Sequence, residues 1–185
     1  MPPTEIIAQI IGFIAMAFNI LSYQQKRQRY IIVWQLLGTM LFTINFFLLG
    51  AYTGALLNAV GIVRAIVFLN KKTLKSDHPI WLFAFICVYI ASYVLTFTVF
   101  HKEFKLLTAV VELLPVVGMT ATTLAFRSKT AKTTRLLGLI SAPSWLVYNI
   151  FAKSMGAILC EAFCMVSILI GYLRLDRTAN KENVD

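Results

Sequence analysis

The sequence predicts an all-α membrane protein with seven transmembrane helices, built as two parallel three-helix repeats joined by a linker helix. Three observations predict this class. Hydrophobic residues make up 59% of the 185-residue chain and the mean hydropathy is +0.77, whereas average proteins contain about 45–50% apolar residues. The apolar residues gather in stretches of membrane-crossing length. Finally, a pattern of short motifs recurs about a hundred residues further along the chain.

Each apolar stretch is long enough to form one spanning helix, because about 20 residues cross the hydrocarbon core and the usual range is about 17–25. The backbone must satisfy its own polar groups in lipid, so we expect helices throughout. The first stretch lacks the basic start and the cleavage site of a signal peptide, and it is therefore counted as a span. The expected spans cover residues 5–23, 31–50, 54–70, 80–100, 104–126, 136–152 and 155–173.

An internal repeat groups these spans into two copies. Leu36-Leu37-Gly38 returns as Leu136-Leu137-Gly138, and the run TGALL at 53–57 returns as SMGAIL at 154–159. A copy of three spans ends on the side of the membrane opposite to its start. A single linker span returns the chain to the first side, so the second copy has the same orientation as the first. Parallel repeats of this kind are a known plan of transporters. The predicted units are a first repeat over residues 1–75, a linker helix over 76–101, and a second repeat over 102–185 that ends in a short cytoplasmic tail.

The basic residues predict the orientation, because they follow alternate spans. Thirteen of the 17 Lys and Arg residues lie after spans 1, 3, 5 or 7, three lie in the opposite loops, and Arg64 lies inside a span. Cytoplasmic loops carry the excess of Lys and Arg, so we expect the N-terminus outside and the C-terminus in the cytoplasm. The thirteen are Lys26, Arg27, Arg29, Lys71, Lys72, Lys75, Arg127, Lys129, Lys132, Arg135, Arg174, Arg177 and Lys181, and the other three are Lys102, Lys105 and Lys153.

Several classes of function are disfavoured by what the sequence lacks. The formal charge of +9 is spread over short loops, without the basic face or tail that binds nucleic acid. No Walker loop for ATP is present, and His78 and His101 stand apart in loops. The cysteines at 87, 160 and 164 lie inside apolar spans, where they are expected to be small core residues. We therefore expect no metal, no cofactor, no catalytic residues and no enzymatic activity.

Four polar residues inside the spans are the candidate substrate-binding residues. A charged group at the centre of a spanning helix costs about 2.5–3.5 kcal/mol on insertion scales, so each needs a reason to be there. Glu112 in span 5 and Glu161 in span 7 are expected at similar depths, where they could share one polar centre and support a proton-coupled step. Asn58 in span 3 takes about the position of Cys160–Glu161 in span 7, and Arg64 follows six residues later. We expect these four residues to line a polar cavity between the repeats.

Each of these residues also has a purely structural interpretation. Either glutamate could be a hydrogen-bonded packing residue, and Asn58 could join helices by a hydrogen bond worth about 0.6 kcal/mol on average in membranes. Arg64 could reach toward the cytoplasmic interface, pair with a carboxylate or hold an anionic group. Asn45 and Asn149, at matching points of spans 2 and 6, are expected to cap or hydrogen-bond helices.

Three further residues are candidate gating or hinge positions. Gln25 lies at the cytoplasmic end of span 1 and is a candidate for an inner gate, with a solvated loop end as the simpler interpretation. Pro115 in span 5 and Pro143 in span 6 permit kinks, because proline frees a helical carbonyl. Such kinks are hinges in an alternating-access transporter and packing irregularities in a static bundle, and the sequence leaves both interpretations open.

Several short runs in both halves of the chain form recognisable motifs. They are Val111–Gly118 (VELLPVVG), Phe46–Gly50 (FFLLG), Leu57-Asn58-Ala59, and the stretch from Trp145 through Tyr148-Asn149 and Ser154-Met155-Gly156 to Glu161. With these runs the chain resembles the YgjV family of bacterial inner-membrane proteins. The resemblance covers most of the chain and implies a location in the bacterial inner membrane.

The 3+1+3 plan also resembles the SWEET and PQ-loop transporters. Their Pro-Gln motif is degenerate here, as Tyr23-Gln24-Gln25-Lys26, and the first copy lacks the prolines of their helices. Asn58 matches the pocket asparagine that those families carry in the third helix of each copy. The second copy departs from the pattern with Cys160 or Glu161, which argues against a neutral sugar and favours a cationic or proton-coupled substrate.

Two functions follow from these observations. The first is a small secondary transporter or facilitator of unknown substrate, with its binding cavity between the repeats. The alternative is a membrane receptor or scaffold that binds a protein or lipid partner without transport, and it predicts a closed core in which the glutamates are paired internally. The oligomeric state is left open.

Overall fold

The structure is a computed structural model that describes residues 3–49, 52–99, 101–151 and 155–176, and the regular elements in these ranges are all helices. Lys153, Ser154, Arg177 and Lys181, which entered the predictions of the repeat and the orientation, lie outside the described residues. The helices are α1 (Pro3–Ser22), α2 (Gln28–Leu48), α3 (Tyr52–Leu69), α4 (Lys71–Leu74), α5 (Pro79–Thr98), α6 (Leu106–Arg127), α7 (Ala131–Phe151), α8 (Met155–Gly171) and a π-helical turn, η1 (Tyr172–Asp176).

Each predicted stretch contains one long helix, and the bounds differ most for α7. This helix begins at Ala131, five residues before the predicted start at 136. The hydroxyl of Thr130 accepts a hydrogen bond from the backbone N–H of Thr133 at 3.1 Å, and it thereby satisfies one of the open donors of the first turn. The first turn of α7 is polar, so a search for apolar stretches could not find it.

Five described helices are long and apolar enough to cross a membrane. They are α1, α2, α5, α6 and the stretch Gly156–Leu175, in which α8 continues into η1. Helix α3 is apolar but shorter, counted over Gly54–Leu69, and α7 has the length but a more polar composition. The all-helical membrane class is thus confirmed, while the seven-span 3+1+3 plan stays a prediction.

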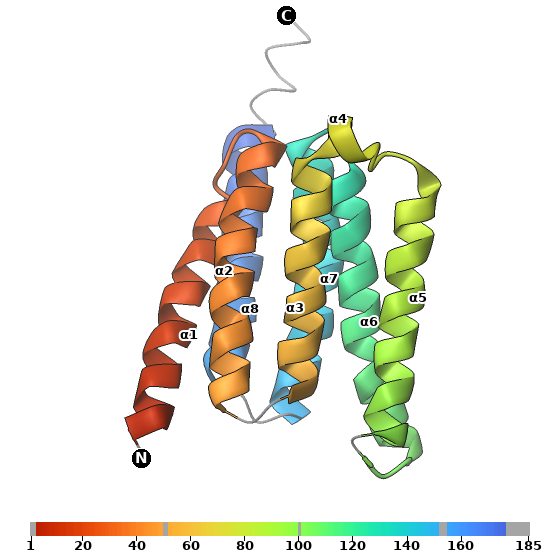
Figure 1. The fold of residues 1–185 in the computed structure, drawn as a ribbon. Coiled ribbons are helices and arrows are strands. Elements are labelled where there is room, and N and C mark those ends of the chain that lie inside the picture. The colour runs from red at the N-terminus through yellow and green to blue at the C-terminus, as the bar shows by residue number, and fades with distance from the viewer. Residues whose placement is uncertain (1–2, 50–51, 100, 152–154, 177–185) are drawn as a thin grey trace, which may run out of the picture.

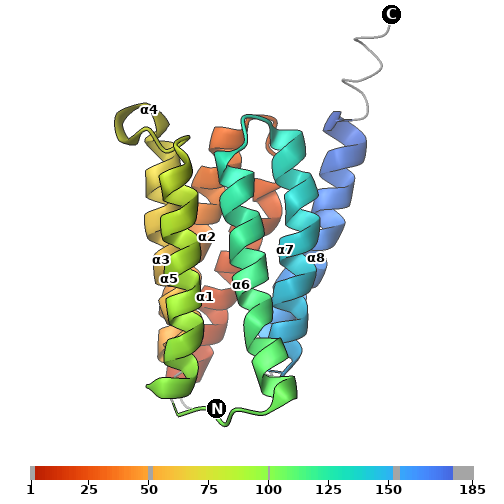
Figure 2. The ribbon, with the colours of Figure 1, turned by 90° about the vertical axis from the view of Figure 1, so that its right-hand side faces the viewer.

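The long helices stand side by side and alternate in direction (Figure 1). Helices α1, α3, α6 and α8 run one way, and α2, α5 and α7 run the other way. Helix α2 packs against α1 and α3, which together form the first triplet, and α7 packs against α6 and α8, which form the second triplet. The triplets meet where α1 contacts α8 and α3 contacts α6, and α5 packs outside this circuit against α3 and α6 (Figure 2).

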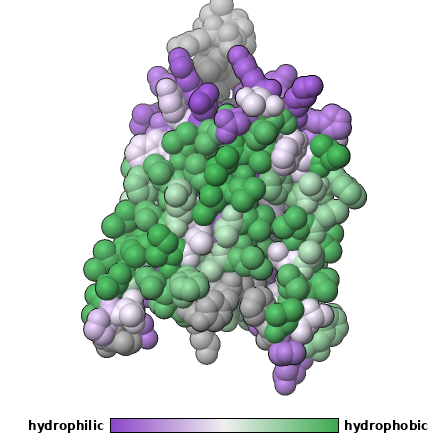
Figure 3. All heavy atoms as spheres, viewed as in Figure 1, coloured by the Kyte–Doolittle hydropathy of each residue, from purple (hydrophilic) through white to green (hydrophobic). Residues whose placement is uncertain are grey.

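The outside of the bundle is apolar between two polar ends (Figure 3). Large hydrophobic side chains remain exposed along its length, such as Phe13 at 51%, Phe83 at 70% and Val166 at 54%. A soluble monomer rarely exposes so many large hydrophobic side chains together, and such a surface indicates contact with a membrane or a partner. Hydrophilic side chains gather at the end that carries α4, here called the α4 end (Figure 3).

Two hydrophobic clusters lie on opposite sides of the bundle. One joins α3, α5 and α6 around Phe68, Phe85 and Phe126, and the ring centroids of Phe68 and Phe126 lie 6.3 Å apart. The other joins α1, α2 and α8 around Phe46 and Ile168. The space between the clusters is where the polar residues of the spans come together.

Arg135 is placed differently from the prediction, which counted it among the basic residues of a loop. It lies inside α7 and is 1% exposed. Its Nε donates to the carbonyl oxygen of Tyr23 at 2.9 Å and its Nη2 donates to that of Gln25 at 2.6 Å. Gly171 makes room for this contact, since a Cβ there would lie 2.5 Å from the Tyr23 carbonyl oxygen and 3.0 Å from Arg135 Nε. Arg135 therefore fastens the α1–α2 turn to the second triplet.

Candidate functional site

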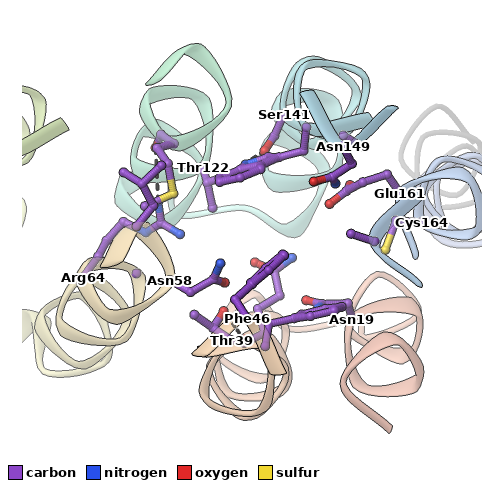
Figure 4. Close-up of a pocket in the computed structure, with 18 of the residues that line it drawn as sticks. Asn19, Thr39, Phe46, Asn58, Arg64, Thr122, Ser141, Asn149, Glu161 and Cys164 are labelled. Carbon is purple, nitrogen blue, oxygen red and sulfur yellow. Dashed lines mark hydrogen bonds between the residues drawn. The ribbon is translucent and has the colours of Figure 1, made fainter. Parts of the chain in front are cut away.

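A polar pocket lies at the centre of the bundle, between the two triplets (Figure 4). All six helices of the triplets contribute side chains to it, and α5 contributes none. Its volume is about 100 Å³, measured as space for the centres of water molecules. One water needs roughly 10–15 Å³ on this measure, so the pocket has room for several waters or one small molecule. Its polar lining comprises Asn19, Tyr23, Gln35, Thr39, Asn58, Arg64, Thr122, Ser141, Asn149 and Glu161.

Arg64 reaches the pocket from α3 and is 5% exposed. Its Nη1 donates to the Tyr89 hydroxyl at 3.3 Å and to the Met119 carbonyl oxygen at 3.2 Å. The guanidinium also lies 5.0 Å from the centroid of the Phe126 ring, an attractive cation–π arrangement. Its Nε has no hydrogen-bond partner, and no carboxylate of the described residues forms an ion pair with it. The predicted alternatives of reaching for the interface or pairing with a carboxylate are therefore wrong for this structure.

Asn58 projects from α3 into the middle of the pocket (Figure 4). Its side-chain nitrogen donates to the Gly54 carbonyl oxygen at 2.9 Å, within the same helix. This bond fixes the direction of the side chain without using a neighbouring helix. The interhelical hydrogen bond of the structural interpretation is therefore not formed by this amide nitrogen.

Glu161 and Asn149 face the pocket from the opposite side, on α8 and α7 (Figure 4). Asn149 is 2% exposed, and its side-chain oxygen has no hydrogen-bond partner. Among the described residues, Glu161 forms no ion pair. Buried polar atoms are almost always hydrogen-bonded, so an orphaned oxygen at a pocket wall calls for an explanation, such as a water or a ligand. Asn149 was expected only to support a helix end, and the sequence held no sign that it faces a cavity.

Glu112 does not reach this pocket, which corrects the prediction that it lines the same cavity as Glu161. Its carboxylate forms an ion pair with Lys102, and both residues line a separate pocket with Tyr148. The register of α6 explains the difference. Thr122 of α6 hydrogen-bonds Ser141 of α7 at 2.9 Å. Thr122 lies sixteen residues after the start of α6, whereas Ser141 lies ten before the end of α7, so α6 extends further beyond the pocket and carries Glu112 with it.

The three predicted gating or hinge residues lie at other places. The side-chain nitrogen of Gln25 donates to the Leu21 carbonyl oxygen of its own turn at 3.1 Å. Pro115 and Pro143 lie inside α6 and α7, and both helices continue past them. Their role as hinges stays a prediction.

Gln24, which the sequence analysis passed over in favour of Gln25, joins the triplets at the α4 end. Its Nε2 donates to the carbonyl oxygen of Ser167 at 2.7 Å and to its hydroxyl at 2.8 Å. The Ser167 hydroxyl in turn donates to the Ile20 carbonyl oxygen at 2.6 Å. Gln24 belongs to the degenerate YQQK motif. The motif indicated that this segment matters, but it did not indicate which of the two glutamines contacts the other triplet.

An apolar exterior around a polar centre, with helices of spanning length, defines an integral membrane protein whose bundle encloses a pocket. The chain belongs to the Imp-YgjV family, described as bacterial inner membrane protein, whose family model matches residues 6–179. It is 26% identical over 182 residues to the inner membrane protein YgjV of Escherichia coli (strain K12), and the match covers 97% of this chain and 89% of that protein. No solved structure matches the chain. The predicted family is confirmed, and the chain is a multi-pass protein of the bacterial inner membrane.

Proposed function

We propose that this protein is a secondary transporter or facilitator of a small molecule, and that the substrate binds in the central pocket. The observation that carries the proposal is the pocket itself, because all six helices of the two triplets line it with polar groups inside an apolar exterior. A polar cavity at membrane depth is costly to build, and such cavities mark substrate or ion pathways.

The proposal includes the plan of seven spans as two parallel repeats. The helix directions support it, since α1, α2 and α3 run up, down and up, as do α6, α7 and α8 (Figure 1). The packing supports it as well. In two equivalent repeats, α1 corresponds to α6 and α3 corresponds to α8. The contact of α1 with α8 should therefore have a counterpart between α6 and α3, and both contacts are present. A binding site between parallel repeats is a known arrangement in transporters.

The hydrogen bonds between the triplets support a gate at the α4 end. Gln24 binds Ser167, Arg135 binds the α1–α2 turn, and the side chain of Gln28 donates to the Ala125 carbonyl oxygen at 2.7 Å. Within the described ranges, no side-chain hydrogen bond joins the triplets at the other end of the bundle. We propose that these bonds close the pocket at the α4 end. Because that end carries the basic loops, we propose that it faces the cytoplasm, with α1 starting outside.

The receptor or scaffold alternative has one observation in its favour. It predicts internally paired glutamates, and Glu112 is paired with Lys102. Glu161, however, faces the pocket without an ion-pair partner among the described residues. The unpaired carboxylate at the pocket wall favours transport.

Native Cys164, which lines the pocket, provides the test. A variant with Cys87→Ser and Cys160→Ser keeps it as the single thiol, and a further Cys164→Ser variant is the matched control. We expect a small, charged, membrane-impermeant thiol reagent to modify Cys164 faster in right-side-out vesicles than in inside-out vesicles. Absence of modification from either side would contradict an accessible pocket and favour the closed core of the alternative.

A further inference from the structure

We infer that the central pocket binds a small amphoteric molecule, with its carboxylate on Arg64 and its amino group at Glu161 and Asn149. The inference rests on the proposed function and names the substrate class of that site. It goes beyond the sequence-based expectation of a cationic or proton-coupled substrate, because it assigns opposite ends of one ligand to opposite walls.

The Arg64 wall of the pocket requires an anion. Arginine carries its charge at all physiological pH values, and burial without a counter-charge is strongly unfavourable. Tyr89 and Met119 occupy Nη1, while Nε is fully buried and lacks a partner. A hydroxyl, a carbonyl oxygen and a ring face solvate the guanidinium without neutralising it. A carboxylate in the pocket supplies the missing charge next to the guanidinium, and its geometry matches that planar group.

The α7–α8 wall of the pocket requires a donor. Asn149 presents an oxygen without a hydrogen-bond partner, and Glu161 presents carboxylate oxygens without a cation among the described residues. The two side chains enter the pocket from neighbouring helices that pack against each other. An ammonium group offers three N–H donors and a positive charge, so a single amino group satisfies both oxygens.

The depths of the two walls set the length of the ligand. Helices α3 and α8 run in the same direction (Figure 1). Arg64 lies twelve residues after the start of α3 and Glu161 lies six after the start of α8. At about 1.5 Å per residue, the two Cα atoms are offset by roughly 9 Å along the bundle. This offset favours a longer ω-amino acid over an α-amino acid, whose charges are separated by a single carbon.

The middle of the pocket suits the methylene chain of such a ligand. Phe46 and Trp145 both line it, and each is held by a close glycine. A Cβ at Gly118 would lie 2.8 Å from Trp145 Cδ1, and one at Gly54 would lie 3.2 Å from the ring of Phe46. Apolar walls with a few placed polar groups are the usual composition of a small-molecule site.

The test measures the thermal stability of the purified full-length protein with 4-aminobutanoate, because a ligand of the folded state raises the melting temperature by mass action. Butanoate and butylamine are the probes with one charged end each, and glycine is the short amphoteric probe. We expect 4-aminobutanoate to raise the melting temperature at lower concentration than any of the three.

Variants assign the two ends. Glu161→Gln, which keeps the shape of the side chain, is expected to abolish the preference for 4-aminobutanoate over butanoate. Arg64→Gln is expected to weaken the binding of 4-aminobutanoate and of butanoate. The concentration of each that gives the same shift in melting temperature should rise by about ten- to a hundredfold, the usual effect of losing a charge-assisted hydrogen bond. Arg64→Lys, which keeps the charge, serves if the glutamine variant does not fold. Lys105→Gln, outside the pocket, is the control and is expected to respond like the unmodified protein.

Two outcomes would overturn the inference. One is an equal response to butanoate and 4-aminobutanoate that is unchanged in Glu161→Gln. The other is the absence of any response to an amphoteric probe. In either case, modification of Cys164 from the vesicle exterior would leave the proposed transport function standing, so the two failures are distinguishable.

Discussion

The side chain of Gln24 donates hydrogen bonds to both the carbonyl oxygen and the hydroxyl of Ser167, at 2.7 and 2.8 Å, across the boundary between the two triplets. These residues are 143 positions apart in the chain. Tyr23, the neighbour of Gln24, lines the central pocket. The contact therefore joins the triplets at the α4 end, next to a residue of the pocket, where we propose the gate.

Gln24→Ala is expected to loosen the contact between the triplets, because it removes both hydrogen bonds from Gln24 to Ser167. We expect faster modification of Cys164 in inside-out vesicles, where the reagent reaches the α4 end. Gln25→Ala is the matched control, since the side chain of Gln25 bonds only to its own turn. Equal rates for the two variants would contradict a gate at Gln24.

Arg135→Gln is expected to lower the free energy of unfolding by about 2–6 kcal/mol, because two acceptors lose their donor at about 1–3 kcal/mol each. The acceptors are the carbonyl oxygens of Tyr23 and Gln25. Arg127→Gln is the control, since Arg127 is at the surface and donates only to the Asp77 carbonyl oxygen in an exposed contact. Unfolding titrations in mixed micelles would measure the free energy of unfolding of both variants. A similar, small decrease for the two variants would show that Arg135 is not a structural link.

Gly171→Ala is expected to destabilise the protein by about 1–3 kcal/mol, the usual cost of overpacking. The new Cβ would lie 2.5 Å from the Tyr23 carbonyl oxygen, which belongs to the backbone and cannot rotate away. Gly156→Ala is the comparison, because the nearest atom to its Cβ would be 3.4 Å away. Thermal denaturation would measure the difference, and equal melting temperatures would refute the close contact.

Lys102→Ala is expected to destabilise the protein by about 1–3 kcal/mol, because it leaves the buried carboxylate of Glu112 without its partner. The side chain of Glu112 is 3% exposed, against 49% for Lys102. Adding Glu112→Leu should restore part of the loss, since the uncompensated charge is then removed. A double-mutant cycle without measurable coupling would argue against the ion pair.

Sequence reasoning could find the helices, but not how far each helix is shifted along its neighbours. Hydrophobicity marks where a chain crosses a membrane, so every predicted stretch contains a helix. Counting residues from the predicted span ends placed Glu112 and Glu161 at similar depths, whereas the register of α6 against α7 separates them. Arg135 looked like a loop residue because it stands beside other basic residues, and only packing shows that the α1–α2 turn surrounds it.

Within the candidate site, Asn58, Arg64 and Glu161 were identified from their polarity, because a polar group in a span is rare enough to stand out. Asn149 and Gln24 were not assigned to it. Each lies near a helix end, where polar residues are common and carry no signal. Their roles depend on contacts with other helices, which a single sequence does not contain.

The central claim is transport through the central pocket, which we expect to require opening of the bundle at one end at a time. Paired distance measurements test this most directly. Spin labels would replace Lys26 and Lys129 at the α4 end in one cysteine-free variant, and Leu48 and Phe151 at the opposite end in another. Introducing Gln24→Ala should lengthen the first distance and shorten the second, because opening one end of the bundle closes the other. Distances at both ends that stay the same with and without Gln24→Ala would contradict the account.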